Sequence, residues 1–321
     1  MNARLLITAT FFTAFAGVLG ADAADSQLLS LVMPDAKVLA GVNVDQAKAS
    51  PFGQSVLSQI EANNTGLQQL IALTGFDPTR DVHEVLAASN ATPGGQTGLA
   101  LARGNFDIAK ITAAATAGGG TTESYKGVTI IEDPKQTNGV AFLDSTLAIA
   151  GDLASVKAAI DRPGTGKSLP ATVINQVNQW SAAQDAWVIT TVPLSSLTPP
   201  AGTPPQSGFG AGMQNMFQQI QSFGAGVKFG NNVVVTAQAQ ADNAQDATQM
   251  ANALQLLVNV AQAQAGQNNP DLSSVLQGLS ITTQGSAIKV SLSVPQSQIQ
   301  QLMTQHKDAA ESPARRPMVR K

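Results

Sequence analysis

The sequence predicts an α+β protein of two tandem βαββαβ-like units, each ferredoxin-like with an added hairpin and helix, and with antiparallel sheets. The stretch GVAFLDSTLAIAGDLASVKAAID, residues 139–161, has the pattern of strand, turn, strand and capped helix. A related pattern of strands followed by a helix closes the chain over residues 279–303. With 321 residues, 43% of them hydrophobic, the chain is long and apolar enough for two folded units.

Residues 1–24 have the pattern of a secretory signal peptide. Arg4 precedes an apolar run, and small residues then place a cleavage site near Ala23 or Ala24. The alternative is an N-terminal membrane anchor, but the run is short for a span. The chain has no Cys, which excludes lipid attachment at cysteine and disulfide bonds. We therefore expect an extracytoplasmic protein, periplasmic or secreted.

The first unit is predicted to cover residues 25–162. Its helices should begin where a capping side chain precedes an apolar stripe, at Ser50, Thr65, Asp107 and Asp152. Short apolar or alternating runs predict the strands, at residues 38–44, 82–88, 97–102, 128–131, 140–143 and 147–150. Turns rich in Gly or Pro separate several of these elements.

Residues 163–185 are predicted to be a linker with a short helix near residues 171–180. The second unit, residues 186–305, repeats the order of elements and contains a long helix capped by Asp242. Its other predicted elements are strands over 187–192, 227–229, 233–239, 281–283 and 288–294, and helices over 213–220 and 299–303. Residues 306–321 are expected to be a disordered basic tail.

The most charged stretch of the body is a candidate site. It contains Asp77, Arg80, Asp81, His83 and Glu84. One interpretation is an acid–base pair of His83 with Asp81 or Glu84, as in a hydrolase. The preferred interpretation is a strand entry with Arg80 paired to a neighbouring carboxylate at the surface. One histidine without other nitrogen or sulfur ligands cannot make a zinc site, so we predict no metal and no cofactor.

Two short motifs resemble parts of catalytic sites but lack the required context. Residues 164–168, GTGKS, end like a phosphate-binding loop, yet Asp161 stands where that loop needs its first glycine. Ser286 and Lys289 match the serine and lysine spacing of acyl-enzymes, but they lie in a predicted strand. Positions three apart in a strand point to opposite sides. The sequence therefore predicts no enzyme.

The segment 198–223 joins a loop rich in Pro and Gly to a predicted amphipathic helix. Met-rich faces adapt to apolar ligands, so the segment is a candidate lid over such a ligand. The alternative is an ordinary core stripe at helical spacing. The candidate ligand-binding residues are Phe209, Met213, Met216, Phe217 and Phe223.

Charge limits the choice of partner. The net charge is −3, and the basic residues gathered in the tail leave a more acidic body, which argues against nucleic acid. The tail is a candidate for peripheral contact with an anionic envelope surface, or else a solvated terminus. Its basic residues include Arg315, Arg316, Arg320 and Lys321.

Two segments, Gly75-Phe76-Asp77-Pro78 with Asp81-Val82 and Arg103-Gly104-Asn105-Phe106-Asp107, resemble parts of uncharacterised secreted bacterial proteins. Those proteins alternate short strands with Ala-rich helices, and the resemblance implies no known activity. The sequence thus leads to an exported, non-enzymatic binding or envelope-associated interaction protein of unknown ligand. Two alternatives stay open: a carrier for an apolar or lipid ligand with residues 198–223 as its lid, and a hydrolase with a site near His83.

Overall fold

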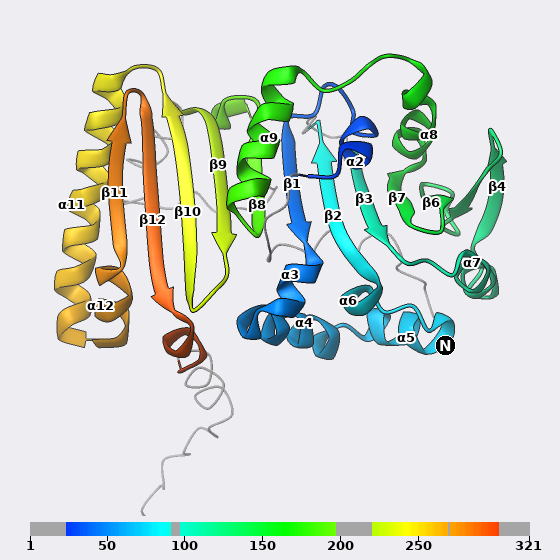
Figure 1. The fold of residues 1–321 in the computed structure, drawn as a ribbon, viewed down its shortest axis with the longest axis horizontal. Coiled ribbons are helices and arrows are strands. Elements are labelled where there is room, and N and C mark those ends of the chain that lie inside the picture. The colour runs from blue at the N-terminus through cyan, green and yellow to red at the C-terminus, as the bar shows by residue number, and fades with distance from the viewer. Residues whose placement is uncertain (1–23, 91–96, 197–219, 269, 302–321) are drawn as a thin grey trace, which may run out of the picture.

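One antiparallel sheet runs through the described chain, with the strand order β11-β12-β10-β9-β8-β1-β2-β3-β7-β6-β5-β4 (Figure 1). The computed structural model describes residues 24–90, 97–196, 220–268 and 270–301. All neighbouring strands in the described sheet are antiparallel. The predicted α+β class with antiparallel pairing is therefore confirmed.

The strands fall into two groups along the chain. Those before residue 163 are β1 (Val38–Asn43), β2 (Val82–Ser89), β3 (Gly98–Gly104), β4 (Thr121–Tyr125), β5 (Val128–Glu132), β6 (Asn138–Asp144) and β7 (Leu147–Asp152). Those after it are β8 (Ala186–Thr190), β9 (Ile220–Lys228), β10 (Asn232–Ala241), β11 (Leu279–Gln284) and β12 (Ala287–Pro295).

The described helices connect these strands and cover the sheet. The first half contains α2 (Ser26–Ser30), α3 (Val44–Ala49), α4 (Pro51–Asn63), α5 (Thr65–Thr74), α6 (Pro78–Asp81), α7 (Ile108–Ala117), α8 (Leu153–Asp161) and the short η1 (Arg162–Gly164). They are followed by α9 (Ala171–Ala183), η2 (Leu194–Ser196), α11 (Ala244–Asn268) and α12 (Pro270–Gln277).

Strand β1 joins the two groups of strands. It pairs with β2 along one edge and with β8 along the other, so both halves of the chain share one sheet. The predicted linker contains α9, whose Val173, Val177 and Trp180 are buried in the large core. The order of elements along the sequence does not determine whether the two halves share a sheet, and the pairing of β1 with β8 shows that they do.

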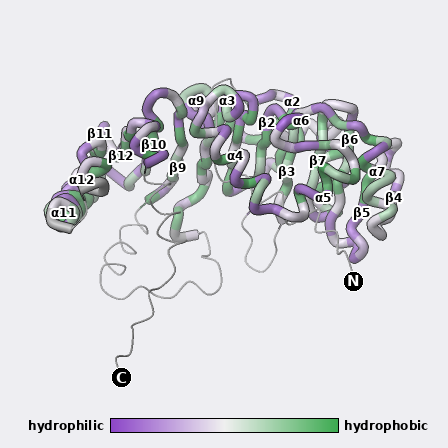
Figure 2. Tube along the Cα trace, turned by 90° about the horizontal axis from the view of Figure 1, so that it is seen from below, coloured by the Kyte–Doolittle hydropathy of each residue, from purple (hydrophilic) through white to green (hydrophobic). Residues whose placement is uncertain are grey.

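The two sides of the sheet in the first half differ in how they are covered. Helices α2 and α5 lie on opposite sides of the strands (Figure 2). On the first side, here called the α9 face, α2, α8 and α9 bury Leu39, Leu86, Leu101 and other large residues in the main core. On the other side, here called the α5 face, a smaller core includes Val85, Phe142 and Ala148 with residues of α3 and α7.

Several helix starts follow the predicted caps. The side chain of Ser50 accepts a hydrogen bond from the Gly53 amide, with Pro51 at the first position of α4. Asp107 caps α7 and Asp152 caps α8 in the same way. Two predicted caps were wrong by one residue. Asn64, not Thr65, accepts from the Leu67 amide, and Asn243, not Asp242, accepts from the Asp246 amide.

Strand β9 is the largest departure from the predicted elements. Residues 227–229 were expected to form a short strand, whereas the strand runs from Ile220 to Lys228. Ile220 was assigned to a helix whose other predicted residues, 213–219, lie outside the described part of the chain. Glycines weaken the strand pattern here, but packing requires them. A Cβ on Gly224 would lie 2.4 Å from the ring of Trp180.

Several further elements were not predicted. The edge strand β4 has the polar sequence TTESY, which carries no apolar alternation. Helices α2, α3, α6 and α12 are short, between four and eight residues. The residues of α2 were interpreted as a lead-in and the start of α6 as a turn, and no helix was predicted at α3 or α12. In α2 the buried Leu28 and Leu29 join the main core, so residues just after the predicted signal peptide help to form the fold.

Candidate functional site

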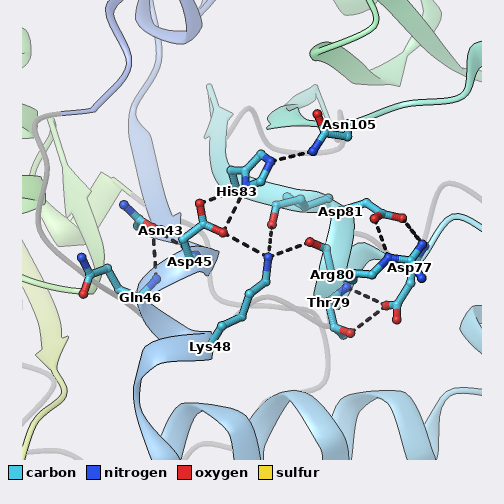
Figure 3. A network of polar contacts seen from close by, with 11 residues as sticks. Asn43, Asp45, Gln46, Lys48, Asp77, Thr79, Arg80, Asp81, His83 and Asn105 are labelled. Atoms are coloured by element: carbon cyan, nitrogen blue, oxygen red, sulfur yellow. Dashed lines mark hydrogen bonds and ion pairs between the residues drawn. The ribbon is translucent and has the colours of Figure 1, made fainter.

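The predicted charged cluster falls into a group around His83 and a group around Arg80, and Lys48 contacts both (Figure 3). His83 lies on β2 with its Nδ1 at 2.8 Å from Asp45 Oδ2 and its Nε2 at 3.0 Å from Asn105 Nδ2. Asp77, Arg80 and Asp81 form a local turn at α6. Glu84 lies apart from both, because its Oε1 accepts a hydrogen bond of 3.2 Å from the Asp25 amide.

Lys48 anchors the histidine group to the sheet. Its Nζ lies 3.1 Å from Asp45 Oδ1 and donates to the carbonyl oxygens of Arg80 and Val82 at 2.8 and 2.9 Å. Burial alone would raise the pKa of Asp45, but hydrogen bonds from His83 and Lys48 outweigh it and hold that pKa below its ordinary range. These contacts tie α3 to the start of β2.

The α6 turn is satisfied within itself. Arg80 donates to Asp81 through Nε and Nη2, both at 2.7 Å, and Nη2 also donates to the Gly75 carbonyl at 2.7 Å. This ion pair lowers the pKa of Asp81. Asp77 accepts from the amide and hydroxyl of Thr79 and so caps α6. Arg80 is therefore paired with a neighbouring carboxylate, as in the preferred interpretation of this stretch.

The histidine group lacks the geometry of a nucleophilic site. Asn105 Nδ2 occupies the Nε2 side of the His83 ring, and Asp45 occupies the Nδ1 side. A serine-type mechanism needs a hydroxyl or thiol at the nitrogen that Asn105 occupies. Among the described residues, no group of three or more His, Asp or Glu side chains could hold a metal ion. Asp45, Lys48 and Asn105 were not predicted, because they are distant from His83 in sequence.

The other predicted sites are mostly outside the described chain. Phe209, Met213, Met216 and Phe217 lie there, as does the basic tail with Arg315, Arg316, Arg320 and Lys321. Phe223 is described and lies on β9, where its amide donates to Thr190 Oγ1 at 3.0 Å. Its side chain packs against a small apolar cluster that includes Ala247 and Met250 of α11. No helix of the described residues is long and apolar enough to cross a membrane.

The segment 164–168 has the structural context expected from the sequence, whereas Ser286 lies in a turn and not in the predicted strand. Residues 164–168 follow α8 and η1 rather than a strand. Lys289 lies on β12, and Ser286 lies in the turn before it, where its hydroxyl accepts from the Gln240 side chain. Neither segment places its lysine as a phosphate-binding loop or an acyl-enzyme requires.

A cavity of about 410 Å³ lies between the α5 face of the sheet and helices α4, α5 and α7. Its floor consists of side chains from β2, β3, β5, β6 and β7, including Ala100, Ala102, Ala148 and Ala150. Most of its walls and roof are also apolar, with Leu57 and Ile60 from α4, Leu67, Leu70 and Leu73 from α5, and Ile111 and Ala114 from α7. The polar residues Asn64, Thr65, Gln69 and Thr79 line it as well. Among the described residues that line this cavity, none has a charged side chain.

The alternation of residue size along two strands explains the cavity. In β3 and β7, Leu99, Leu101, Leu147 and Ile149 are fully buried in the core of the α9 face. The residues between them are alanines, which point to the opposite face because side chains alternate along a strand. Ala100 pairs with Ala150, and Ala102 pairs with Ala148. Four small side chains therefore lie together and leave the space above them unfilled.

Helix α5 forms the roof without being buried itself. It packs against α4 and α7, and none of its apolar side chains is fully buried. Leu73 lines the cavity and is still 65% exposed. A helix whose apolar side chains remain this accessible has weaker tertiary stabilisation than one packed on a core.

A second, open hollow of about 450 Å³ adjoins one end of the cavity. Phe76 and Phe106 line both spaces. The remaining lining of the hollow is mostly polar, with Arg80, Asp81, Asn105, Asp107, Lys110 and Ser145 among its residues. The charged cluster predicted from the sequence thus contributes two of its members, Arg80 and Asp81, to the surroundings of the cavity.

Comparisons with known proteins bear on the fold alone. No protein-family model and no curated protein sequence matches this chain. The structure titled "Structure of crystal form III of TP0453" is similar with a TM-score of 0.53 at 10% identity, covering 89% of this chain and 99% of that chain. Crystal form I of TP0453 gives a TM-score of 0.51 at 12% identity, covering 88% and 98%. At such identity the likeness extends to the α+β architecture and no further.

Proposed function

We propose that this protein is an exported, non-enzymatic binding protein that carries an apolar ligand in the cavity beneath α5. The observation that carries the proposal is the apolar cavity of about 410 Å³. Far smaller apolar cavities, of about 150 Å³, already exclude water and bind small hydrocarbons. Pockets that hold metabolites and lipids are apolar, largely pre-formed and a few hundred Å³ or more.

The location of this site differs from the lid suggested by the sequence. The cavity is lined by residues 57–150 of the first half, and Phe223 does not line it. A role in protein interaction at the envelope is the second candidate, supported by the export pattern of residues 1–24. A hydrolase near His83 has less support, because the ring nitrogen that would activate a nucleophile faces Asn105.

The test fills the cavity and leaves the other face of the sheet unchanged. The double variant Ala102→Leu/Ala148→Leu places larger side chains on the cavity floor, whereas Ala109→Leu/Ala113→Leu makes the same change at exposed positions of α7. Binding is measured with the fluorescent apolar probe N-phenyl-1-naphthylamine. We expect wild type and the α7 control to bind it and the filled variant to bind at least about tenfold more weakly.

Stability measurements on the same variants separate filling from damage. Side chains that enter an existing cavity leave the free energy of unfolding unchanged or raise it, whereas overpacking a full core lowers it by about 1–3 kcal/mol. A wild-type protein that does not bind the probe would contradict the proposal. Equal binding by the filled variant would place the ligand elsewhere and also count against it.

A further inference from the structure

The apolar cavity and the polar hollow meet at a pair of aromatic rings. Phe76 and Phe106 are both buried, and their ring centroids are 5.5 Å apart. Phe106 also packs on Phe142 in the cavity floor, with centroids 5.3 Å apart. A continuous site can therefore pass from apolar to polar surroundings across these two side chains, which line both spaces.

Hydrogen bonds donated by their backbone amides hold Phe76 and Phe106 in place at this boundary. The Phe76 amide donates to Thr74 Oγ1 at 3.0 Å, directly after Gly75 ends α5 with a φ of +68°. The Phe106 amide donates to the Ser145 carbonyl at 2.8 Å. A positive φ favours glycine, so the turn that aims Phe76 inward depends on Gly75. The boundary is thus part of the folded framework.

Two ion pairs line the hollow, and in each of them a basic side chain contacts an acidic one. Arg80 pairs with Asp81 at 2.7 Å, and Lys110 pairs with Asp107 at 2.8 Å. Each cation has a carboxylate beside it, so these four side chains together carry no net charge. A head group with a single net charge would be repelled by the side chain of like charge in either pair. A head group with one positive and one negative centre can instead find a partner for each.

Resting on the proposed function, we infer that the ligand is an amphiphile with one apolar chain and a zwitterionic head group. The chain occupies the cavity under α5, and the head group lies in the hollow between the Arg80–Asp81 and Asp107–Lys110 pairs. Phe76 and Phe106 contact the part of the ligand where chain and head group join.

The experiment compares probes that share one twelve-carbon chain. Dodecane, dodecanoate, dodecyltrimethylammonium and dodecylphosphocholine compete with N-phenyl-1-naphthylamine for binding to the full-length protein. Dodecane is kept below its solubility limit and the three amphiphiles below their micelle-forming concentrations. We expect dodecylphosphocholine to displace the fluorescent probe at about tenfold lower concentration than the two singly charged probes, a difference of about 1.4 kcal/mol. Equal displacement by all the probes would keep the cavity as a binding site and overturn the head-group assignment.

A charge reversal tests the position of the head group. Lys110→Glu makes the hollow acidic, and Lys126→Glu reverses a comparably exposed lysine that pairs with Asp161 instead. We expect Lys110→Glu to shift the preference from dodecylphosphocholine toward dodecyltrimethylammonium by about tenfold and Lys126→Glu to leave it unchanged. The same preference in both variants would overturn the assignment. Failure of every probe to bind wild type would instead remove the proposed function.

Discussion

Arg103 fastens the beginning of the described chain to the sheet. Its guanidinium donates to Asp25 Oδ2 through Nε and Nη2 at 3.0 and 2.8 Å, and Nη2 also donates to Gln27 Oε1 at 2.8 Å. Asp25 in turn caps α2, accepting from the Gln27 and Leu28 amides. The two side chains are only 22% and 26% exposed, so this pair is less screened than the surface ion pairs of the molecule.

The Asp25 carboxylate gives a pH-dependent prediction. Burial raises the pKa of Asp25, but the Arg103 pair and the amide hydrogen bonds outweigh it and lower the pKa below its ordinary value of 3.8. A lowered folded-state pKa means that the stabilisation is complete above the unfolded-state pKa and is lost as the pH falls through the folded-state pKa. Asp25→Asn keeps a capping residue and removes the charge. At neutral pH we expect it to lower the free energy of unfolding by about 1–3 kcal/mol.

Urea unfolding at a series of pH values measures this difference. The gap between wild type and Asp25→Asn should narrow as the pH falls below about 4. In an Arg103→Gln background the gap should be much smaller at every pH, because the partner is gone. A gap that stays constant with pH would show that the charge of Asp25 does not stabilise the fold.

At the scale of elements, the sequence predicted the parts of the fold that local chemistry determines. Ser50, Asp107 and Asp152 begin helices where their capping side chains indicated. Strand β9 was predicted too short, because its glycines weaken the strand pattern. Gly224 is required by the ring of Trp180 and Gly226 by the side chain of Gln184, and both of these residues are distant in sequence. The partners of His83 likewise come from α3 and from the segment after β3. Local patterns cannot supply such long-range pairings.

The cavity was not predicted, although its cause is present in the sequence. The segments LALA in β3 and LAIA in β7 were interpreted as apolar strands. They also specify large residues on one face and small ones on the other. Whether small residues leave a space depends on how closely the covering helices approach, and that distance is set by α4, α5 and α7 together.

Helix α5 should be the most responsive element of the molecule to ligand. Because its apolar side chains are not fully buried, its amides should exchange hydrogen faster than those of α9, which buries Val173, Val177 and Trp180. Dodecylphosphocholine should slow exchange in α5 and leave α9 unchanged. Hydrogen-exchange mass spectrometry measures both segments in one sample. Slowed exchange in α9 alone, or in neither helix, would contradict a ligand beneath α5.

At the scale of the whole molecule, the two halves are connected by more than the chain. Strand β1 is hydrogen-bonded to β8, and Gly41 of the first half lies opposite Trp187 of the second. The ring of Trp187 lies 2.4 Å from where a Cβ on Gly41 would be, so the two residues are in close contact across this pair of strands. Neither half can separate without exposing a strand edge and an indole ring.

We therefore expect the described residues to unfold as one cooperative unit. Scanning calorimetry should give a single transition with equal calorimetric and van't Hoff enthalpies. Gly41→Ala should lower the temperature of that transition without splitting it, because the added methyl group collides with Trp187. Two resolved transitions would show that the halves fold independently despite their shared sheet.

The alternation of large and small residues along β3 and β7 separates the requirements of folding from those of the cavity. The large residues of these strands pack the sheet against the helices of the α9 face; they are Leu99, Leu101, Leu147 and Ile149. The alanines between them lie on the α5 face and set the depth of the cavity. Exchanging one alanine for valine would shorten the longest chain that fits, and it would leave the main core untouched. Under the proposed function, single substitutions at these alanines would change the chain length that the cavity accepts, while the packing of the main core stays the same.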